Sequence, residues 1–226
     1  MNKLKTVLLL VLVSATGLFA QDSIPNMKQI REQLVAQQKF YGYTDSLFRA
    51  MKPGFLESSV YQLADSLDKS DPTSYFMKIP YLIKDQRLNE AGFIFYLGLL
   101  RFRYYNSVDP DYEAGSGGAL LASFKYEMGE VINPYLKINV ANCIAILNES
   151  LDWYVKNDYR FFSKNKNLEK YDFQATGMRK LITDMEKNKE KYQKQWADER
   201  EVEEKSTASE LNKIDQELKK KVVPAH

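Results

Sequence analysis

Glu127 and Glu130 have the residue type and the spacing that acid–base chemistry uses. Residues three apart share one face of a helix. Hydrolysis of a glycosidic bond needs two carboxylates, because one acts as the acid and the other as base or nucleophile. The same spacing is also typical of a solvated helix face and of partners for arginine. These two glutamates are therefore the candidate catalytic residues, with an ordinary surface role as the alternative.

Three acidic residues, Asp109, Asp111 and Glu113, suggest a metal site in a loop, since hard cations bind several oxygen ligands. The segment departs from the EF-hand pattern at two places. Ala114 stands where that loop needs glycine, and Leu120 stands where it needs a bidentate acid. A solvated loop before a helix is the alternative, and we expect no cofactor.

Arg101, Arg103 and Tyr104, together with Asn133, are the candidate binding residues. Two residues along a helix are about 200° apart, so the two arginines point in nearly opposite directions and cannot clamp one ligand. We expect Arg101 to be at least partly buried, because it follows an apolar stretch. An unpaired buried charge is costly. We therefore predict an ion pair with Glu127 or Glu130.

Histidine and cysteine exclude several kinds of site. The only histidine is His226, the last residue, so a catalytic triad has no imidazole base inside the fold. The only cysteine is Cys143, which excludes an intramolecular disulfide and a thiolate metal cluster. We interpret Cys143 as a small buried side chain. An enzyme built on this sequence would have to use carboxylates, Lys, Arg, Tyr, Ser or a bound cofactor.

Apolar residues recur at helical spacing along most of the chain. The run from Leu88 to Tyr105 is apolar on every face and predicts a buried central helix, in which Gly92 and Gly98 let neighbouring helices come close. Proline and glycine suggest where other helices end. We expect breaks or kinks at Gly42 and Pro80 and a stop before Pro134. Asp71-Pro72 is a helix start signal.

The end of the chain, from Glu186 to Lys221, interleaves acidic and basic residues. Oppositely charged pairs four apart support an exposed helix. Thr207-Ala208-Ser209-Glu210 fits a capping box that would open a last short helix with Leu211, Ile214 and Leu218. We predict a solvated helical tail. An arm that binds a partner through its remaining apolar stripe is the alternative.

The first twenty residues have the pattern of a secretory signal peptide. Lys3 and Lys5 precede an apolar run, and small residues lead to Ala20 before the sequence turns polar. The apolar run is too short for a lasting membrane span. The chain carries 32 Lys and Arg against 30 Asp and Glu, and the two signal lysines account for the difference. The mature chain would be exported and neutral, so nucleic acid is not an expected partner.

A stretch in the middle of the chain resembles an uncharacterised family of bacterial proteins. The residues that carry the resemblance are Phe95-Tyr96 through Arg103, then Ala119 to Phe124, then Gly129 to Asn133. The family shows FY-x-G-Q-x-R-x-R, AL-x-AS and G-x-x-IN segments, and Leu99 stands where its glutamine is expected. The resemblance implies a shared helical fold and no known activity. The glycine-containing aromatic helix also resembles Sel1- and TPR-type hairpins without their repeat consensus.

These observations predict an all-α protein, either a compact bundle or an array of helical hairpins with a polar C-terminal helix. We divide it into a signal peptide at 1–20, a globular domain at 21–185 and a charged tail at 186–226. Two functions remain open. The first is an exported, non-enzymatic binding protein of the bacterial periplasm or cell surface, either an assembly component or an immunity-type inhibitor, whose partner is another envelope protein. The alternative is a carboxylate-dependent envelope hydrolase using Glu127 and Glu130.

Overall fold

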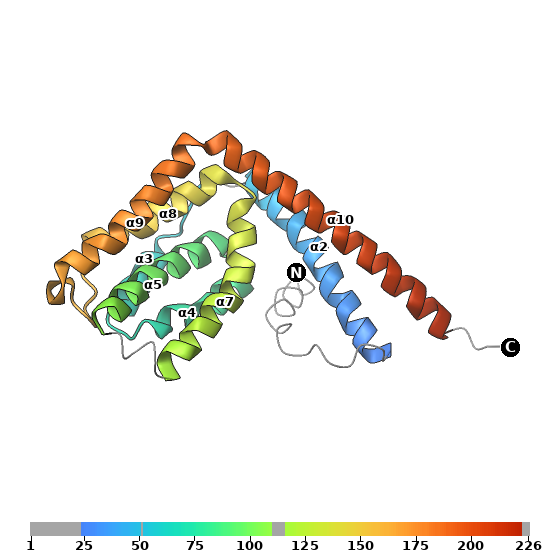
Figure 1. Cartoon of the computed structure of the whole chain (residues 1–226), viewed down its shortest axis with the longest axis horizontal. Helices are drawn as coiled ribbons and strands as arrows, with labels where there is room; N and C mark the ends of the chain where they lie inside the picture. Colours follow the sequence, from blue (N-terminus) through green and yellow to red (C-terminus); the bar gives the residue numbers. More distant parts are fainter. Residues whose placement is uncertain (1–23, 51, 110–115, 223–226) are drawn as a thin grey trace. The chain divides into compact units, whose positions relative to one another are not determined.

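The computed structural model describes residues 24–50, 52–109 and 116–222. Within these ranges the protein is all-α, with eight α-helices, one short 3₁₀ turn and no strand, which confirms the predicted fold class (Figure 1). The signal segment at 1–20 lies outside the described residues. The elements are α2 (Ile24–Ala50), α3 (Ser59–Leu67), α4 (Thr73–Lys84), α5 (Leu88–Val108), α7 (Ser116–Lys137), α8 (Val140–Lys156), η1 (Lys164–Lys166), α9 (Leu168–Lys187) and α10 (Lys189–Val222).

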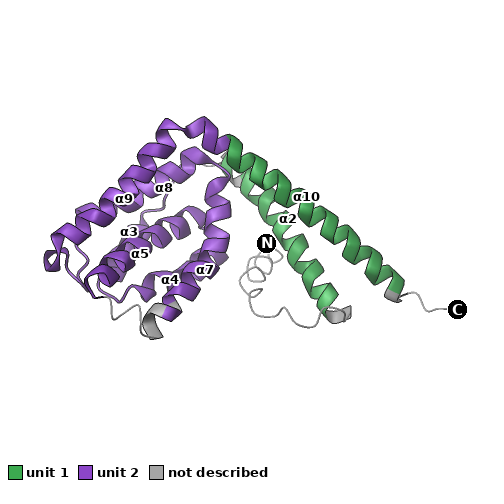
Figure 2. Ribbon diagram, viewed as in Figure 1, with its two compact units in different colours: residues 1–50, 194–226 green, residues 51–193 purple. Residues whose placement is uncertain are grey.

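The chain divides into two compact units (Figure 2). Unit 1 comprises residues 1–50 and 194–226, and unit 2 comprises residues 51–193. These units differ from the division at 185/186 that the charge pattern suggested, because α2 groups with the C-terminal residues. A change in composition marked the polar tail but carried no information about which helix the tail contacts.

In unit 1, α2 and α10 form an antiparallel pair. Later residues of α2 contact earlier residues of α10, as expected for antiparallel helices. Arg31 pairs with Asp215, the hydroxyl of Tyr41 donates to Glu203 at 2.6 Å, and Asp45 pairs with Arg200. Arg200 donates from both terminal nitrogens to the Asp45 carboxylate, at 2.7 Å each. Its guanidinium carbon also lies 4.7 Å from the centre of the Tyr41 ring. This bidentate contact fixes the register of the two helices, since it fits only one alignment.

The predicted capping box at Thr207 is wrong, because α10 is one continuous helix from Lys189 to Val222. Thr207 is buried in the middle of that helix and its hydroxyl lies 3.5 Å from the Gln37 side chain. The alternative interpretation is an arm that binds a partner through an apolar stripe. Leu211 and Ile214 of that stripe are also buried. The predicted break at Gly42 is wrong as well. A glycine inside a helix costs only about 1 kcal/mol, which contacts along the pair offset.

Unit 2 is built around α5, of whose 21 residues 15 are buried. Helices α4, α7, α8 and α9 all pack against it. The predicted central helix is therefore confirmed. The predicted start at Asp71 is confirmed too, since its carboxylate accepts from the Thr73 amide at 2.9 Å. Helices α4 and α7 continue past Pro80 and Pro134, so the expected stop before Pro134 is wrong.

Gly98 permits the closest approach to α5. A Cβ atom added there would lie 2.7 Å from the Cβ of Tyr75 on α4, closer than real Cβ atoms come. Gly92 is less tight, with Ile146 of α8 at 3.3 Å. The small residues of α5 thus set the spacing of the core helices, as the sequence indicated.

We predict that Gly98→Ala lowers the free energy of unfolding by about 1–3 kcal/mol, because the added methyl overpacks the contact with Tyr75. The matched control is Gly177→Ala in α9, where an added Cβ meets nothing within 4 Å. That change should raise stability by about 0.5–1 kcal/mol through helix propensity alone. Urea unfolding followed by circular dichroism measures both. Equal effects of the two substitutions would contradict the steric explanation.

Candidate functional site

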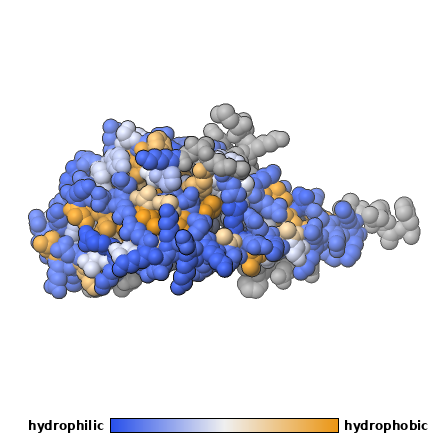
Figure 3. All heavy atoms as spheres, turned by 90° about the horizontal axis from the view of Figure 1, so that it is seen from above, coloured by the Kyte–Doolittle hydropathy of each residue, from blue (hydrophilic) through white to orange (hydrophobic). Residues whose placement is uncertain are grey.

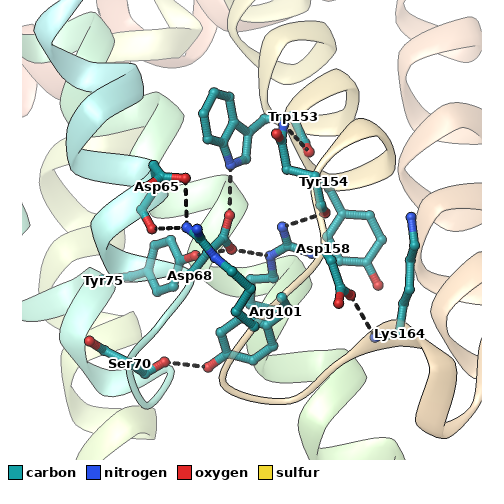
Figure 4. Close-up of polar contacts among 12 residues, drawn as sticks. Asp65, Asp68, Ser70, Tyr75, Arg101, Trp153, Tyr154, Asp158 and Lys164 are labelled. Atoms are coloured by element: carbon teal, nitrogen blue, oxygen red, sulfur yellow. Dashed lines mark hydrogen bonds and ion pairs between the residues drawn. The ribbon is translucent and has the colours of Figure 1, made fainter.

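Arg101 lies on α5 at the centre of a polar cluster and is completely buried. Its Nε donates to the Asp68 carboxylate at 2.8 Å, and a terminal nitrogen donates to the carbonyl of Asn157 at 3.0 Å (Figure 4). Its other terminal nitrogen donates to the hydroxyl of Tyr171. The expected burial is confirmed, and the expected partners Glu127 and Glu130 are wrong. Asp68 takes their place because it ends α3, which the fold brings beside α5.

Asp68 is the acceptor that joins the helices of this cluster. Its carboxylate accepts from Arg101, from the hydroxyl of Tyr75 on α4 at 2.6 Å and from the indole nitrogen of Trp153 on α8 at 2.9 Å. Its backbone carbonyl accepts from the amide of Phe161 at 2.8 Å. One side chain, only 1% exposed, thus receives donors from three helices. A buried carboxylate needs such donors to offset its lost hydration.

Three tyrosine rings surround the guanidinium of Arg101. Its central carbon lies 4.8 Å from the ring centre of Tyr154, 5.3 Å from that of Tyr159 and 5.8 Å from that of Tyr171. Tyr154 and Tyr171 stack with their centres 4.0 Å apart. These distances are within cation–π range. The cluster is therefore an ion pair enclosed in aromatic rings.

Burial changes how these groups titrate. It raises the pKa of Tyr171 to about 12, an effect that the nearby charge of Arg101 opposes. Burial also raises the pKa of Tyr154 and of Tyr159 far above the ordinary range. For Arg101, burial is the largest effect and acts to lower the pKa. The charge of Asp68, the hydrogen bond to it and the nearby Tyr171 and Tyr75 together raise the pKa by more, so the guanidinium stays protonated. Neutral tyrosines and a fixed ion pair result.

The cluster holds the connection between α8 and α9 in place. Tyr159 in this connection donates from its hydroxyl to the carbonyl of Ser70 at 2.8 Å. Arg160 forms an ion pair with Asp65 of α3 at 2.6 Å. Arg101 and Asp68 are closed off from solvent and bonded to protein groups, so they are not placed to receive a ligand. Their chemistry is structural.

The four candidate binding residues do not come together on one surface. Arg101 and Tyr104 are buried, and the Tyr104 hydroxyl donates to the carbonyl of Ser163 at 2.9 Å. Arg103 and Asn133 are exposed. Asn133 accepts from the hydroxyl of Tyr96 at 3.0 Å. The opposite directions of the two arginines follow from the helical geometry, as expected.

The candidate catalytic glutamates hold local partners on α7. Glu127 is half-buried and accepts from the hydroxyl of Ser123, one turn earlier, at 3.2 Å. Glu130 is exposed, and its hydrogen bond with Tyr126 raises the pKa of that tyrosine. These are contacts between neighbours on one helix. Among the described residues, these contacts do not bring the two carboxylates together in one site.

The candidate metal ligands are only partly described. Asp109 is the residue that follows α5, whereas Asp111 and Glu113 lie outside the described residues. Among the residues that the structure describes, no three histidine, cysteine or acidic side chains are grouped so that they could hold a metal ion. Cys143 is buried, as expected, and burial raises the pKa of its thiol to about 12.

The sequence pattern did not predict a second buried polar network. Asn89 on α5 accepts from the hydroxyl of Tyr135 at 2.7 Å and from the side chain of Asn142 at 2.8 Å. Asn142 in turn accepts from the amide of Gly54 at 2.8 Å. Asn89 also donates to the carbonyl of Phe55 at 2.9 Å. An asparagine at the start of an apolar helix was the available signal, because a buried amide must find partners.

Comparison with models of protein families, with curated proteins and with solved structures gave no match. The resemblance to an uncharacterised bacterial family therefore stays a prediction. None of the helices in the described ranges combines the length and the apolar character that crossing a membrane requires.

We predict that Arg101→Ala lowers the free energy of unfolding by about 3–5 kcal/mol, since it leaves the Asp68 carboxylate buried without its cation. Arg103→Ala is the matched control, because it removes the same side chain from an exposed position on the same helix. We expect a change within about 0.5 kcal/mol for the control. Urea unfolding followed through tryptophan fluorescence measures both. An Arg101→Ala protein as stable as the parent would refute a structural role.

We also predict that stability falls at alkaline pH. The pKa of Tyr171 is raised from 10 to about 12 in the folded state, so its contribution is complete below pH 10 and is lost as the pH rises towards 12. Tyrosinate absorbance and circular dichroism, recorded together, test this. The buried tyrosines should ionise only as the helices unfold. Ionisation of every tyrosine near pH 10 with the helices intact would contradict the prediction.

Proposed function

We propose that this protein is an exported, non-enzymatic binding protein of the bacterial envelope that recognises another protein through a helical surface. The observation that carries the proposal is a pair of exposed side chains on α4. Met77 and Tyr81, one turn apart, are 56% and 65% exposed. The residue pattern at 1–20 supports export, and the resemblance to a bacterial family supports a bacterial origin. An assembly component or an immunity-type inhibitor fits this role.

The types of the exposed residues favour a protein partner. Single exposed apolar side chains are normal on any surface. Methionine and tyrosine are, however, enriched in protein interfaces, and tyrosine is frequent among the residues that dominate binding energy. Tyr126, on the helix α7 that packs against α4, is 62% exposed as well. On the face displayed in Figure 3, apolar residues lie in separate groups among hydrophilic ones.

We do not propose hydrolysis by Glu127 and Glu130. Their contacts with Ser123 and Tyr126 are those of ordinary surface carboxylates on one helix. The buried charges that the structure describes in unit 2 already have partners, because Arg101 pairs with Asp68 and Glu90 pairs with Arg87. The observations therefore support recognition more than chemistry.

The test compares partner capture by matched variants of the mature chain. Envelope extract is passed over the parent, over Met77→Ser/Tyr81→Ser and over Leu168→Ser, which removes an apolar side chain that is 55% exposed on α9. We expect a stoichiometric protein partner whose affinity falls at least about tenfold for the α4 double variant only. Circular dichroism confirms that each variant is folded.

Two outcomes would overturn the proposal. The first is equal capture of the partner by the α4 variant and the parent. The second is turnover of cell-wall polymer by the parent that Glu127→Gln or Glu130→Gln abolishes in a folded protein. The second result would establish the hydrolase instead.

A further inference from the structure

The outer face of α9 carries an apolar row with a gap at its centre. Phe173, Gly177 and Leu181 follow one another at intervals of four, so they form one line along the helix. Phe173 is 73% exposed and Leu181 is 43% exposed. A Cβ atom added at Gly177 would meet nothing within 4 Å. Two exposed apolar side chains thus flank a stretch of bare, accessible backbone.

We propose that this face is the contact surface for a second copy of the same chain, with the two α9 helices antiparallel and a two-fold axis passing beside Gly177. In a two-fold interface, residue i of one copy contacts residue j of the other, and j contacts i. Phe173 and Leu181 lie four positions on either side of Gly177. Each phenylalanine therefore meets the leucine of the other copy, while the glycines allow the two backbones to come close.

The charges on this face complement one another in the same arrangement. Lys170 and Asp184 are both exposed and lie seven positions on either side of Gly177, about 10 Å along the axis. The antiparallel two-fold brings Lys170 of each copy opposite Asp184 of the other. A parallel arrangement would instead bring like charges together. This complementarity commits the face to another copy of α9 in the antiparallel sense.

The local partners of these two residues are compatible with the pairing. Lys170 donates to the carbonyl of Ser107, and an ammonium has two further donors. Asp184 accepts from the hydroxyl of Tyr192 at 2.6 Å and from the side chain of Asn188 at 2.9 Å. Its two oxygens offer about four acceptor positions. Each residue can therefore keep its contact within the chain and still form the ion pair.

The size of the face sets the expected strength. Stable interfaces bury about 1,200–2,000 Å² in total, and one face of a helix of 20 residues supplies less than that. We therefore expect a weak dimer, with a dissociation constant in the micromolar range or above. Self-association should be concentration-dependent and should not prevent purification of the monomer.

The decisive experiment is cross-linking of the Gly177→Cys variant of the mature chain under mild oxidation. A residue beside the two-fold axis lies against the same residue of the other copy. In the proposed dimer, their Cα atoms come within the separation of about 4.4–6.8 Å that a disulfide needs. Gly42→Cys is the matched control, since Gly42 is also an exposed helical glycine with nothing within 4 Å. The parent, whose buried Cys143 should not react, is a second control.

We expect a covalent dimer to form at least about tenfold faster from Gly177→Cys than from Gly42→Cys, because the proposed contact raises the effective concentration of the thiols. Cross-linking of the two variants at equal rates would overturn the proposal. This result is independent of the α4 surface, so it does not bear on the envelope partner.

Charge reversal tests the orientation. These charge variants are made in the parent chain, without the Gly177→Cys change, and are studied by sedimentation. Lys170→Asp and Asp184→Lys should each weaken self-association several-fold, and the double variant should restore it. Both residues are exposed, and circular dichroism verifies folding. A protein that stays monomeric at every concentration would refute the dimer, and a double variant without recovery would refute the antiparallel two-fold.

Discussion

The buried ion pair between Arg101 and Asp68 is the interaction on which unit 2 depends. It joins the end of α3 to the central helix α5, and the donors from Tyr75 and Trp153 extend it to α4 and α8. Two buried charges do not by themselves make a fold more stable, because desolvation offsets much of their attraction. Their geometry, however, admits only one arrangement of the helices. The pair therefore specifies the packing around α5.

The same interaction limits what the interior can do. The guanidinium is engaged by a carboxylate, a carbonyl and a hydroxyl, and tyrosine rings lie around it. A side chain held in this way is not placed to bind a ligand from solvent or to take part in proton transfer with one. The surface is where recognition can take place. Exposed aromatic and apolar side chains lie on α4, α7 and α9. The two proposed contact surfaces are built from such side chains.

Unit 1 uses charge in a different way. Two helices alone bury few apolar residues, and the seam between α2 and α10 includes Tyr41, Asp45 and Arg200. Polar residues at such a seam weaken the packing but specify the register, because a shift along the helix would separate each pair. The interleaved charges of the C-terminal residues thus form contacts within the chain as well as with solvent. The helical partner that they contact is α2.

The sequence by itself determined the helical class, the central place of α5, the burial of Arg101 and the use of glycine for close contacts. These properties follow from local periodicity and from the cost of an unpaired buried charge. Asp68 was not predicted as the partner of Arg101, and α2 was not predicted as the partner of the tail. Only the tertiary structure decided both pairings, because residues 33 and more than 150 positions apart meet through packing that no local pattern encodes.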